Sequence, residues 1–243
     1  QEGTRRNYSV FVTTSQDIHL PNGDIYIKKH MDGVIFAGEV DIRVIEEFRK
    51  QSIPVVLVNN YLDMDGLVCI SADHYGGAVQ ATEYLCKLGH CKIGLLSGRF
   101  SPQVSEARIE GFVKTLAKYD IPVDDRFIAD IEPALEDGEE IMTRMLRGVD
   151  RPTAFFCTND TIAAGAMKAV TRAGLRVPED IAIIGFDDSY ISRVVEPELT
   201  TVRIDAAKMG CLAMQTLFYL IAGMPVEKAH IQIPTELIVR GTA

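Results

Sequence analysis

The chain has 243 residues, 47% of them hydrophobic and 24% charged, which is enough for one large domain or two smaller lobes with cores of their own. Its formal net charge of −9 argues against a segment that grips nucleic-acid phosphates by itself, because such binding depends on clustered Lys and Arg. No apolar run approaches the roughly 18 residues that a membrane span requires, so no membrane segment is expected.

Short apolar runs alternate along the chain with stretches of helical spacing. Strands are predicted at Tyr8–Thr13, Val34–Ala37, Val55–Val58, Val68–Ile70, Ile93–Leu96, Phe127–Ile131, Ala154–Cys157 and Ile181–Phe186. Helices are predicted at Asp41–Gln51, Tyr75–Leu88, Arg108–Lys118, Asp137–Arg147 and Thr161–Ala173. This alternation indicates βαβ units with right-handed crossovers and parallel sheets, and therefore an α/β fold.

The alternation of predicted strands and helices changes after residue 204. A long helix is predicted at Asp205–Ala222, followed by two short strands, Ile231–Ile233 and Leu237–Val239, with Pro234 between them. Periodicity alone leaves open whether the strands form one sheet or two. The chain opens with QEGTRRNYSVF, without an initiator Met or a leader, so we expect it to begin partway through a fold.

The five cysteines are odd in number and mostly lie in apolar runs, which favours reduced core thiols over a disulfide framework. Cys86 and Cys91 flank Leu88-Gly89-His90, and a zinc site is conceivable there. No second pair of ligands follows at the spacing of a zinc finger, however, and Gly89 fits the end of a helix. We therefore predict no metal site.

The segment GLRVPEDIAIIGFDD, Gly174–Asp188, is the most informative part of the sequence. Gly174 can end a helix because glycine takes positive φ at little cost, and Pro178 prevents the helix from continuing. The apolar run that follows is typical of a parallel strand covered on both faces. Asp187 and Asp188 come directly after it, at the edge of an open α/β sheet where ligands bind.

No catalytic set is visible in the sequence. The glycine patterns of dinucleotide and P-loop sites are absent, as are G-x-S-x-G and H-E-x-x-H, and the five histidines are scattered. Asp187 and Asp188 would make a poor acid/base pair, since consecutive residues of an extended chain point to opposite sides. No enzymatic activity and no cofactor are therefore predicted.

Polar residues do follow several predicted strands. Asn59, Asn159 and Asp187 stand at strand ends, and Arg108 is expected near the first turn of the helix after Ile93–Leu96. Each has a structural alternative: Arg108 could be a solvated helix residue and Asn159 a loop amide, while Asp73 and Asp160 are natural N-caps. Together, an Asp, an Asn and an Arg would suit a polyhydroxylated or amide-rich small molecule.

In this order the residues resemble the effector-binding core of the LacI/GalR family of bacterial transcription regulators. The most specific pieces are GLRVPEDIAIIGFDD followed by PELTTV at Pro197–Val202. The others are Met31-Asp32-Gly33-Val34-Ile35, IPVVLVNN (Ile53–Asn60), LGHCKIGLLSG (Leu88–Gly98), EARIEGF (Glu106–Phe112), TND (Thr158–Asp160) and ELIVRGT (Glu236–Thr242). The resemblance runs from about Tyr8 to the last residue.

The resemblance implies two lobes like those of periplasmic sugar-binding proteins, crossed near Ser71, Arg203 and Pro234. The N-terminal lobe would hold residues 1–71 and 204–233, and the C-terminal lobe residues 72–203 and 234–243. From this resemblance, we expect the chain to lack the family's helix-turn-helix, its hinge helix, and the first strand and most of the first helix of the core. Ile18–His30 is a shorter and poorer helix than the family has there.

By their positions in the motifs, Arg108, Asn159 and Asp187 are similar to the family's effector-contacting residues. Asn59 and Ile70, at the cleft side of the N-terminal lobe, match the family's effector contacts less specifically. The resemblance further implies a cytoplasmic homodimer that senses a sugar or related small metabolite between its lobes and reaches operator DNA through an N-terminal domain not present here. A periplasmic solute receptor of the same fold is the alternative. A sugar-processing enzyme comes third, because no acid/base or nucleophile pair can be placed.

Overall fold

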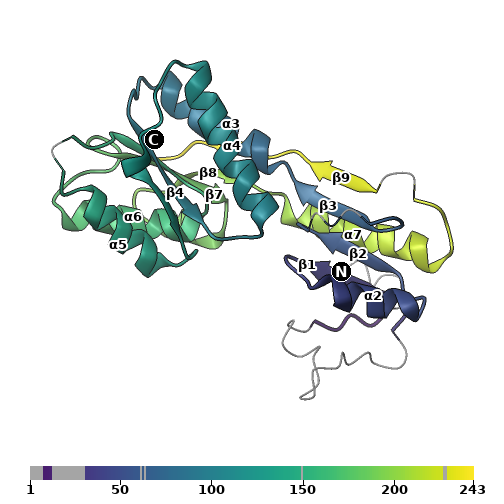
Figure 1. Ribbon diagram of the computed structural model, residues 1–243. Helices are drawn as coiled ribbons and strands as arrows, with labels where there is room; N and C mark the ends of the chain where they lie inside the picture. Colours follow the sequence, from purple (N-terminus) through teal and green to yellow (C-terminus); the bar gives the residue numbers. More distant parts are fainter. Residues whose placement is uncertain (1–7, 13–30, 61, 63, 149, 227–228) are drawn as a thin grey trace. The chain divides into compact units, whose positions relative to one another are not determined.

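The computed structural model describes residues 8–12, 31–60, 62, 64–148, 150–226 and 229–243. The chain divides into two compact units, the first from Gln1–Ala72 and Asp205–Ile233, the second from Asp73–Ile204 and Pro234–Ala243. Each unit contains a mostly parallel sheet flanked by helices (Figure 1). The predicted α/β class, with two sheets rather than one, is confirmed.

The first unit is built on a four-stranded parallel sheet of order β1-β2-β3-β9. Val44, Ile45 and Phe48 of one helix, α2, pack against the face that carries Leu57. Val56 points to the other face and is also fully buried, where a second helix, α7, contacts β2. The elements are β1 (Val34–Ala37), α2 (Ile42–Lys50), β2 (Val55–Val58), β3 (Val68–Ala72), α7 (Ala206–Ile221) and β9 (His230–Ile233).

The second unit is built on a six-stranded sheet of order β10-β8-β7-β6-β4-β5, parallel except for β10, which pairs antiparallel with β8. Its strands are β4 (Ile93–Gly98), β5 (Ile128–Ile131), β6 (Ala154–Cys157), β7 (Ala182–Asp187), β8 (Thr200–Arg203) and β10 (Glu236–Ile238). Its helices are α3 (His74–Lys87), α4 (Pro102–Lys118), α5 (Leu135–Met145) and α6 (Asp160–Arg172), with short 3-10 turns at Asp125–Phe127 and Tyr190–Arg193.

Both faces of this second sheet are buried. Neighbouring residues of β6 point in opposite directions, so Phe155 joins the core under α5 and α6 while Phe156 joins the core under α3 and α4. The two helix pairs lie on opposite sides of the sheet in Figure 1. This three-layer packing explains why the strands read as continuous apolar runs without alternation.

Helices α5 and α6 approach closely at Gly165. A Cβ added at Gly165 would lie 2.1 Å from the carbonyl oxygen of Leu135 and 2.8 Å from the amide nitrogen of Glu139. Both obstacles are backbone atoms, which cannot turn aside as the end of a side chain can. Gly165 is therefore required by the packing of this helix pair. Gly210 in α7 differs, since within the described residues no atom outside the local backbone of α7 lies within 4 Å of its would-be Cβ.

Several predicted elements match the structure residue for residue, among them the strands at Val34–Ala37, Val55–Val58 and Ala154–Cys157. Helix α4 begins at Pro102 and not near Arg108, because Pro102 occupies its first turn after the N-cap Ser101. Arg108 thus lies in the second turn, which corrects the expectation of a first-turn position. The poor helix expected at Ile18–His30 lies outside the described residues.

Two strand assignments are corrected. The strand predicted from Tyr8 does not form over the described residues 8–12. These residues pair with neither sheet, and Val12 is 94% exposed. Conversely, β8 forms at Thr200–Arg203, where periodicity predicts no strand. Its threonines are buried because their hydroxyls are hydrogen-bonded, Thr200 accepting from the Arg240 amide at 2.9 Å.

Three of the five cysteines are buried, whereas Cys91 and Cys211 are exposed, and all five are free thiols. Within the described residues no group of three or more His, Cys, Asp or Glu side chains could hold a metal ion. Among the helices of the described ranges, none combines the length and the apolar character needed to cross a bilayer.

Candidate functional site

Several loops and helix starts of the second unit meet at one edge of its sheet. Strands β4, β6 and β7 end there, and helices α4 and α6 start there because each follows such a strand. Helix α3 also starts at this edge, since it runs antiparallel to the strands before leading into β4. Arg108, Asn159 and Asp187 all belong to these segments.

Arg108 is almost completely buried in α4, with 3% of its surface exposed. Its Nη2 donates to Oδ1 of Asp187 at 3.3 Å, and its Nη1 donates to the carbonyl oxygen of Thr158. The guanidinium also lies 3.9 Å from the ring centroid of Phe186 and 4.9 Å from that of Phe100. Arg108 is therefore a fixed internal cation, which excludes the solvated-helix alternative.

Asp187 is the last residue of β7 and is held in an unusual conformation. Its φ is 109°, a region that residues with a side chain rarely adopt and that costs on the order of 1–3 kcal/mol. The surrounding protein raises the pKa of its carboxyl group, an effect that the neighbouring Arg108 partly offsets. The side chain keeps 36% of its surface exposed, so the carboxylate can still accept hydrogen bonds from a ligand.

Asn159 caps the N-terminus of α6. Its Oδ1 accepts a hydrogen bond from the amide of Ile162 at 2.8 Å. Its side-chain nitrogen forms no hydrogen bond within the described part of the chain, which leaves a donor at the same edge as Asp187. Asn159 thus combines a structural role with a free polar group.

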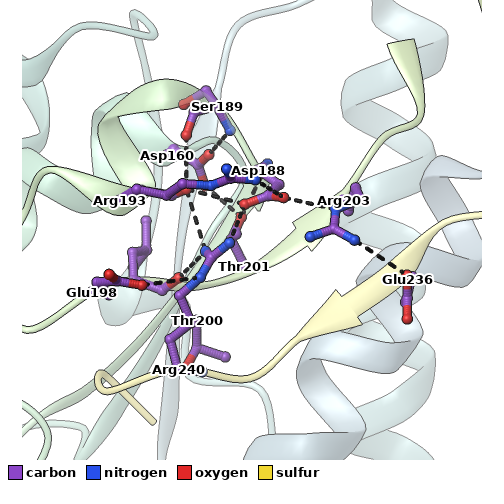
Figure 2. Close-up of polar contacts among 12 residues, drawn as sticks. Asp160, Asp188, Ser189, Arg193, Glu198, Thr200, Thr201, Arg203, Glu236 and Arg240 are labelled. Atoms are coloured by element: carbon purple, nitrogen blue, oxygen red, sulfur yellow. Dashed lines mark hydrogen bonds and ion pairs between the residues drawn. The ribbon is translucent and has the colours of Figure 1, made fainter. Parts of the chain in front are cut away.

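Asp160 is a natural N-cap by sequence, but Asn159 is the N-cap of α6, so Asp160 has a different structural role. Its carboxylate accepts hydrogen bonds from the Ser189 amide at 2.6 Å and from the Thr201 hydroxyl at 2.5 Å (Figure 2). Burial raises the pKa of Asp160 to about 6. Since Ser189 closes the turn that begins at Asp187, Asp160 holds that turn in place.

Asp188 lies among three arginines, as Figure 2 shows. Its carboxylate oxygens are 2.5 Å from Arg240, 2.7 Å from Arg203 and 3.4 Å from Arg193. Burial alone would raise its pKa, but hydrogen bonds from Arg240 and Arg203 hold it at about 2. Arg203 also faces Glu236 at 3.6 Å. The chain is not extended here, with φ of 50° at Asp188, yet the adjacent carboxylates still face different partners.

His74 is a member of this edge that sequence reasoning missed. Its Nδ1 accepts from Nη2 of Arg108 at 3.2 Å and faces Nε of Arg108 at 3.4 Å. Burial, together with the charge of Arg108, lowers the pKa of His74 to about 3. The signal available in the sequence is its position directly after the N-cap Asp73, which accepts from the Gly76 amide at 2.8 Å.

Asn59 and Ile70 belong to the first unit, where they lie side by side. The amide of Asn59 donates to the carbonyl oxygen of Ile70 at 2.9 Å, and its Oδ1 accepts from the Ala72 amide at 3.2 Å. Asn59 has a left-handed φ of 51° at the end of β2, while Ile70 is fully buried. The five predicted residues therefore form two groups, three residues in the second unit and two in the first.

Unsatisfied polar atoms also gather at the edge of the second sheet. Within the described ranges, three buried side-chain atoms have no hydrogen-bond partner: Nε2 of His74 and the hydroxyl oxygens of Ser97 and Ser101. Ser97 is next to the last residue of β4 and Ser101 is the N-cap of α4, so both belong, like His74 at the start of α3, to segments that reach this edge of the sheet. Buried polar atoms are normally paired, and such exceptions are expected where a polar ligand binds.

Comparison with known proteins agrees with this architecture. Residues 82–243 match the family model of the periplasmic binding protein-like domain. The chain is 34% identical over 236 residues to a Bacillus subtilis protein named "Probable HTH-type transcriptional repressor ExuR", covering 96% of this chain and 70% of that protein.

Two solved structures are similar over most of the chain. A regulatory protein of the LacI family from Chloroflexus aggregans superimposes with a TM-score of 0.85 at 28% identity, covering 99% of this chain and 88% of that one. A LacI family regulator from Enterococcus faecium, with bound ribose, has a TM-score of 0.80 at 28% identity over 87% of this chain and 79% of its own. The chain belongs to the LacI family of transcriptional regulators, of which it contains the periplasmic-binding-protein-like core.

Proposed function

We propose that the chain senses a small uncharged polar effector, a sugar or a related metabolite, through Arg108, Asn159 and Asp187 of the second unit and Asn59 and Ile70 of the first. The observation that carries this proposal is Asp187, a partly exposed carboxylate fixed by a buried arginine at a backbone φ of 109°. Strain of this kind persists where the surroundings enforce it, which is common at ligand sites.

The chemistry of the edge favours hydroxyl groups over anions. The guanidinium of Arg108 is already matched by the Asp187 carboxylate and by carbonyl and imidazole acceptors. Asp187 would repel an anionic ligand, whereas its oxygens can accept hydrogen bonds from two neighbouring hydroxyls. The free amide nitrogen of Asn159 adds a donor. The ribose bound by the Enterococcus faecium relative is of this class.

The regulatory role follows from the relatives. The Bacillus subtilis relative is named as a helix-turn-helix repressor, so we propose that this core forms a cytoplasmic homodimer and changes operator affinity through a DNA-binding domain outside this sequence. Such coupling requires the effector to bind two arrangements of the units with different affinity. A sensor, rather than an enzyme or a transport receptor, is the role that its regulatory relatives support.

A thermal-shift screen followed by calorimetry tests the site. Sugars, nucleobases and amino acids are screened at millimolar concentration, since a ligand of the folded state raises the stability in proportion to ln(1 + [L]/Kd). We expect a neutral sugar-like compound to bind, and Asp187→Ala and Arg108→Ala each to weaken it by about 1–3 kcal/mol. Asp130→Asn, an exposed acid of the same unit, is the control. Unchanged affinity in both site variants would refute the assignment.

The regulatory half of the proposal has its own measurement. Operator affinity of the intact regulator is compared with and without the compound that the screen identifies. We expect a change of at least about fivefold, the lower end of allosteric coupling in proteins. Identical operator affinity in both conditions would leave a binding protein without regulatory coupling and would contradict the sensor role. Sedimentation of the core tests the homodimer separately.

A further inference from the structure

His74 differs from the other histidines that the structure describes in being enclosed beside the candidate site. Only 2% of its surface is exposed, and its ring centroid lies 6.0 Å from that of Phe186, the residue before Asp187. It occupies the first turn of α3, a helix that starts at the edge of the sheet where Asp187 ends β7.

The hydrogen bonds of His74 define which ring nitrogen carries the proton. Arginine only donates, so the Nδ1 atom that faces Nη2 and Nε of Arg108 must be an acceptor. In a neutral imidazole the proton is then on Nε2. That N–H is a buried donor without a partner among the described residues, which is a costly arrangement for a folded protein.

We propose that His74 is part of the effector site, with Nδ1 holding the guanidinium of Arg108 toward Asp187 and the Nε2–H donating to an acceptor atom of the effector. This inference rests on the proposed function and extends it to a residue and a ligand feature. The effector then needs an acceptor, such as a ring, carbonyl or hydroxyl oxygen, for His74 as well as hydroxyls for Asp187.

Two isosteric substitutions separate the two nitrogens. In His74→Asn the side-chain oxygen can replace Nδ1 as the acceptor for Arg108, but no donor reaches the position of Nε2. In His74→Gln the amide nitrogen can replace the Nε2 donor, but the acceptor beside Arg108 is lost. His74→Phe keeps the ring and removes both groups. His90→Asn is the control, because His90 contacts Thr153 through Nδ1 and precedes β4 at the opposite edge of the sheet.

Binding is measured by calorimetry on the 243-residue chain with D-ribose, D-glucose, D-galactose, cellobiose and adenine as probes. For the probe that binds, we expect each His74 variant to weaken affinity by about 5- to 100-fold, and His74→Phe should bind with the lowest affinity of the three. The His90 variant should bind as the unmodified chain does. If Asp187→Asn abolishes binding while all His74 variants bind normally, the inference is wrong and the proposed site stands. If no probe binds, or if Asp187→Asn and all His74 variants bind normally, both are overturned.

Nitrogen NMR of the histidine rings provides a readout that a purely structural histidine would not change. In the free protein His74 should be neutral and protonated on Nε2 from pH 5 to 8. Addition of the bound probe should shift the His74 Nε2 and its proton and slow the exchange of that proton with water. A ring protonated on Nδ1, or one whose Nε2 signals are unmoved by a saturating probe, would overturn the inference even if affinities change.

Discussion

Arg240 and Asp188 are 52 positions apart in the chain and form an ion pair at 2.5 Å, with 11% and 3% of their side chains exposed. Arg240 also donates to the carbonyl oxygen of Leu199 at 2.7 Å, which ties the end of the chain to the segment before β8. The pair is therefore enclosed and supported by further hydrogen bonds, conditions under which breaking it is strongly destabilising.

We expect Arg240→Ala to lower the free energy of unfolding by about 3 kcal/mol, because it leaves the buried Asp188 carboxylate with less compensation. Arg193→Ala is the matched control. Arg193 is 60% exposed and 3.4 Å from the same carboxylate, so its loss should cost less than about 1 kcal/mol. Urea denaturation measures both, and equal effects of the two substitutions would show that enclosure of the pair is unimportant.

Asp160 should make stability depend on pH in a defined direction. Its pKa in the folded protein is about 6, above the ordinary value of 3.8, so the folded state binds the proton more tightly than the unfolded chain. The resulting stabilisation is complete below about pH 4 and is lost as pH rises through about 6. A shift of about two pKa units corresponds to roughly 3 kcal/mol.

Asp160→Asn removes this titration while keeping the shape of the side chain. Between pH 7.5 and pH 4, the unmodified chain should therefore gain up to about 3 kcal/mol relative to the Asn variant in the free energy of unfolding. Glu140→Gln, at an exposed position of α5, controls for the loss of one acidic group. If the difference in unfolding free energy between the unmodified chain and the Asn variant stays constant over this pH range, the raised pKa of Asp160 is contradicted.

Two glycine substitutions should act in opposite directions. Gly165→Ala forces a Cβ against the backbone of α5 and should cost about 2–3 kcal/mol. Gly210→Ala places its Cβ in open space within helix α7 and should stabilise by about 0.5–1 kcal/mol, because the unfolded chain loses freedom. Thermal and urea unfolding measure both, and destabilisation by Gly210→Ala would contradict the open surroundings assigned to this position.

The two roles of Asn159 can be separated by the residue that replaces it. Asn159→Ala removes the cap of α6 and should cost about 1 kcal/mol of stability. Asn159→Ser keeps a capping oxygen, so stability should stay within about 0.5 kcal/mol, but the amide donor is lost. We expect both variants to bind the effector more weakly. Normal binding by the Ser variant would restrict Asn159 to helix capping.

The sequence is sufficient to predict the α/β class and most of the helices and strands, because the buried strands are short uninterrupted apolar runs. Periodicity missed β8 for a physical reason: Thr200 and Thr201 look polar in sequence, and only their hydrogen bonds make them suitable for a core. The strand predicted from Tyr8 was wrong for the opposite reason. Its residues have strand propensity, but a strand also needs a neighbour, which composition cannot provide.

The candidate site was predicted in part. Asp187 follows from its place after a buried strand, and Arg108 and Asn159 from the family motifs that contain them. Asp160 was misassigned because Asn159 and Asp160 are both good caps, and only the backbone geometry selects one of them. His74 was missed because it joins this edge through its hydrogen bond to Arg108, 34 positions away, and no local pattern in the sequence indicates such a contact.

Arg203 is the last residue of β8 and lies opposite Glu236, the first residue of β10, so it sits beside two of the three places where the chain leaves or enters the second unit. The same guanidinium holds Asp188, the covalent neighbour of Asp187. Any displacement of the Asp187–Asp188 turn would therefore change the ion pair of Arg203, whose side chain lies beside both of these junctions. The ion pairs of Arg203 thus connect the turn that contains Asp187 to strands β8 and β10, next to the two points where the chain passes from one unit to the other.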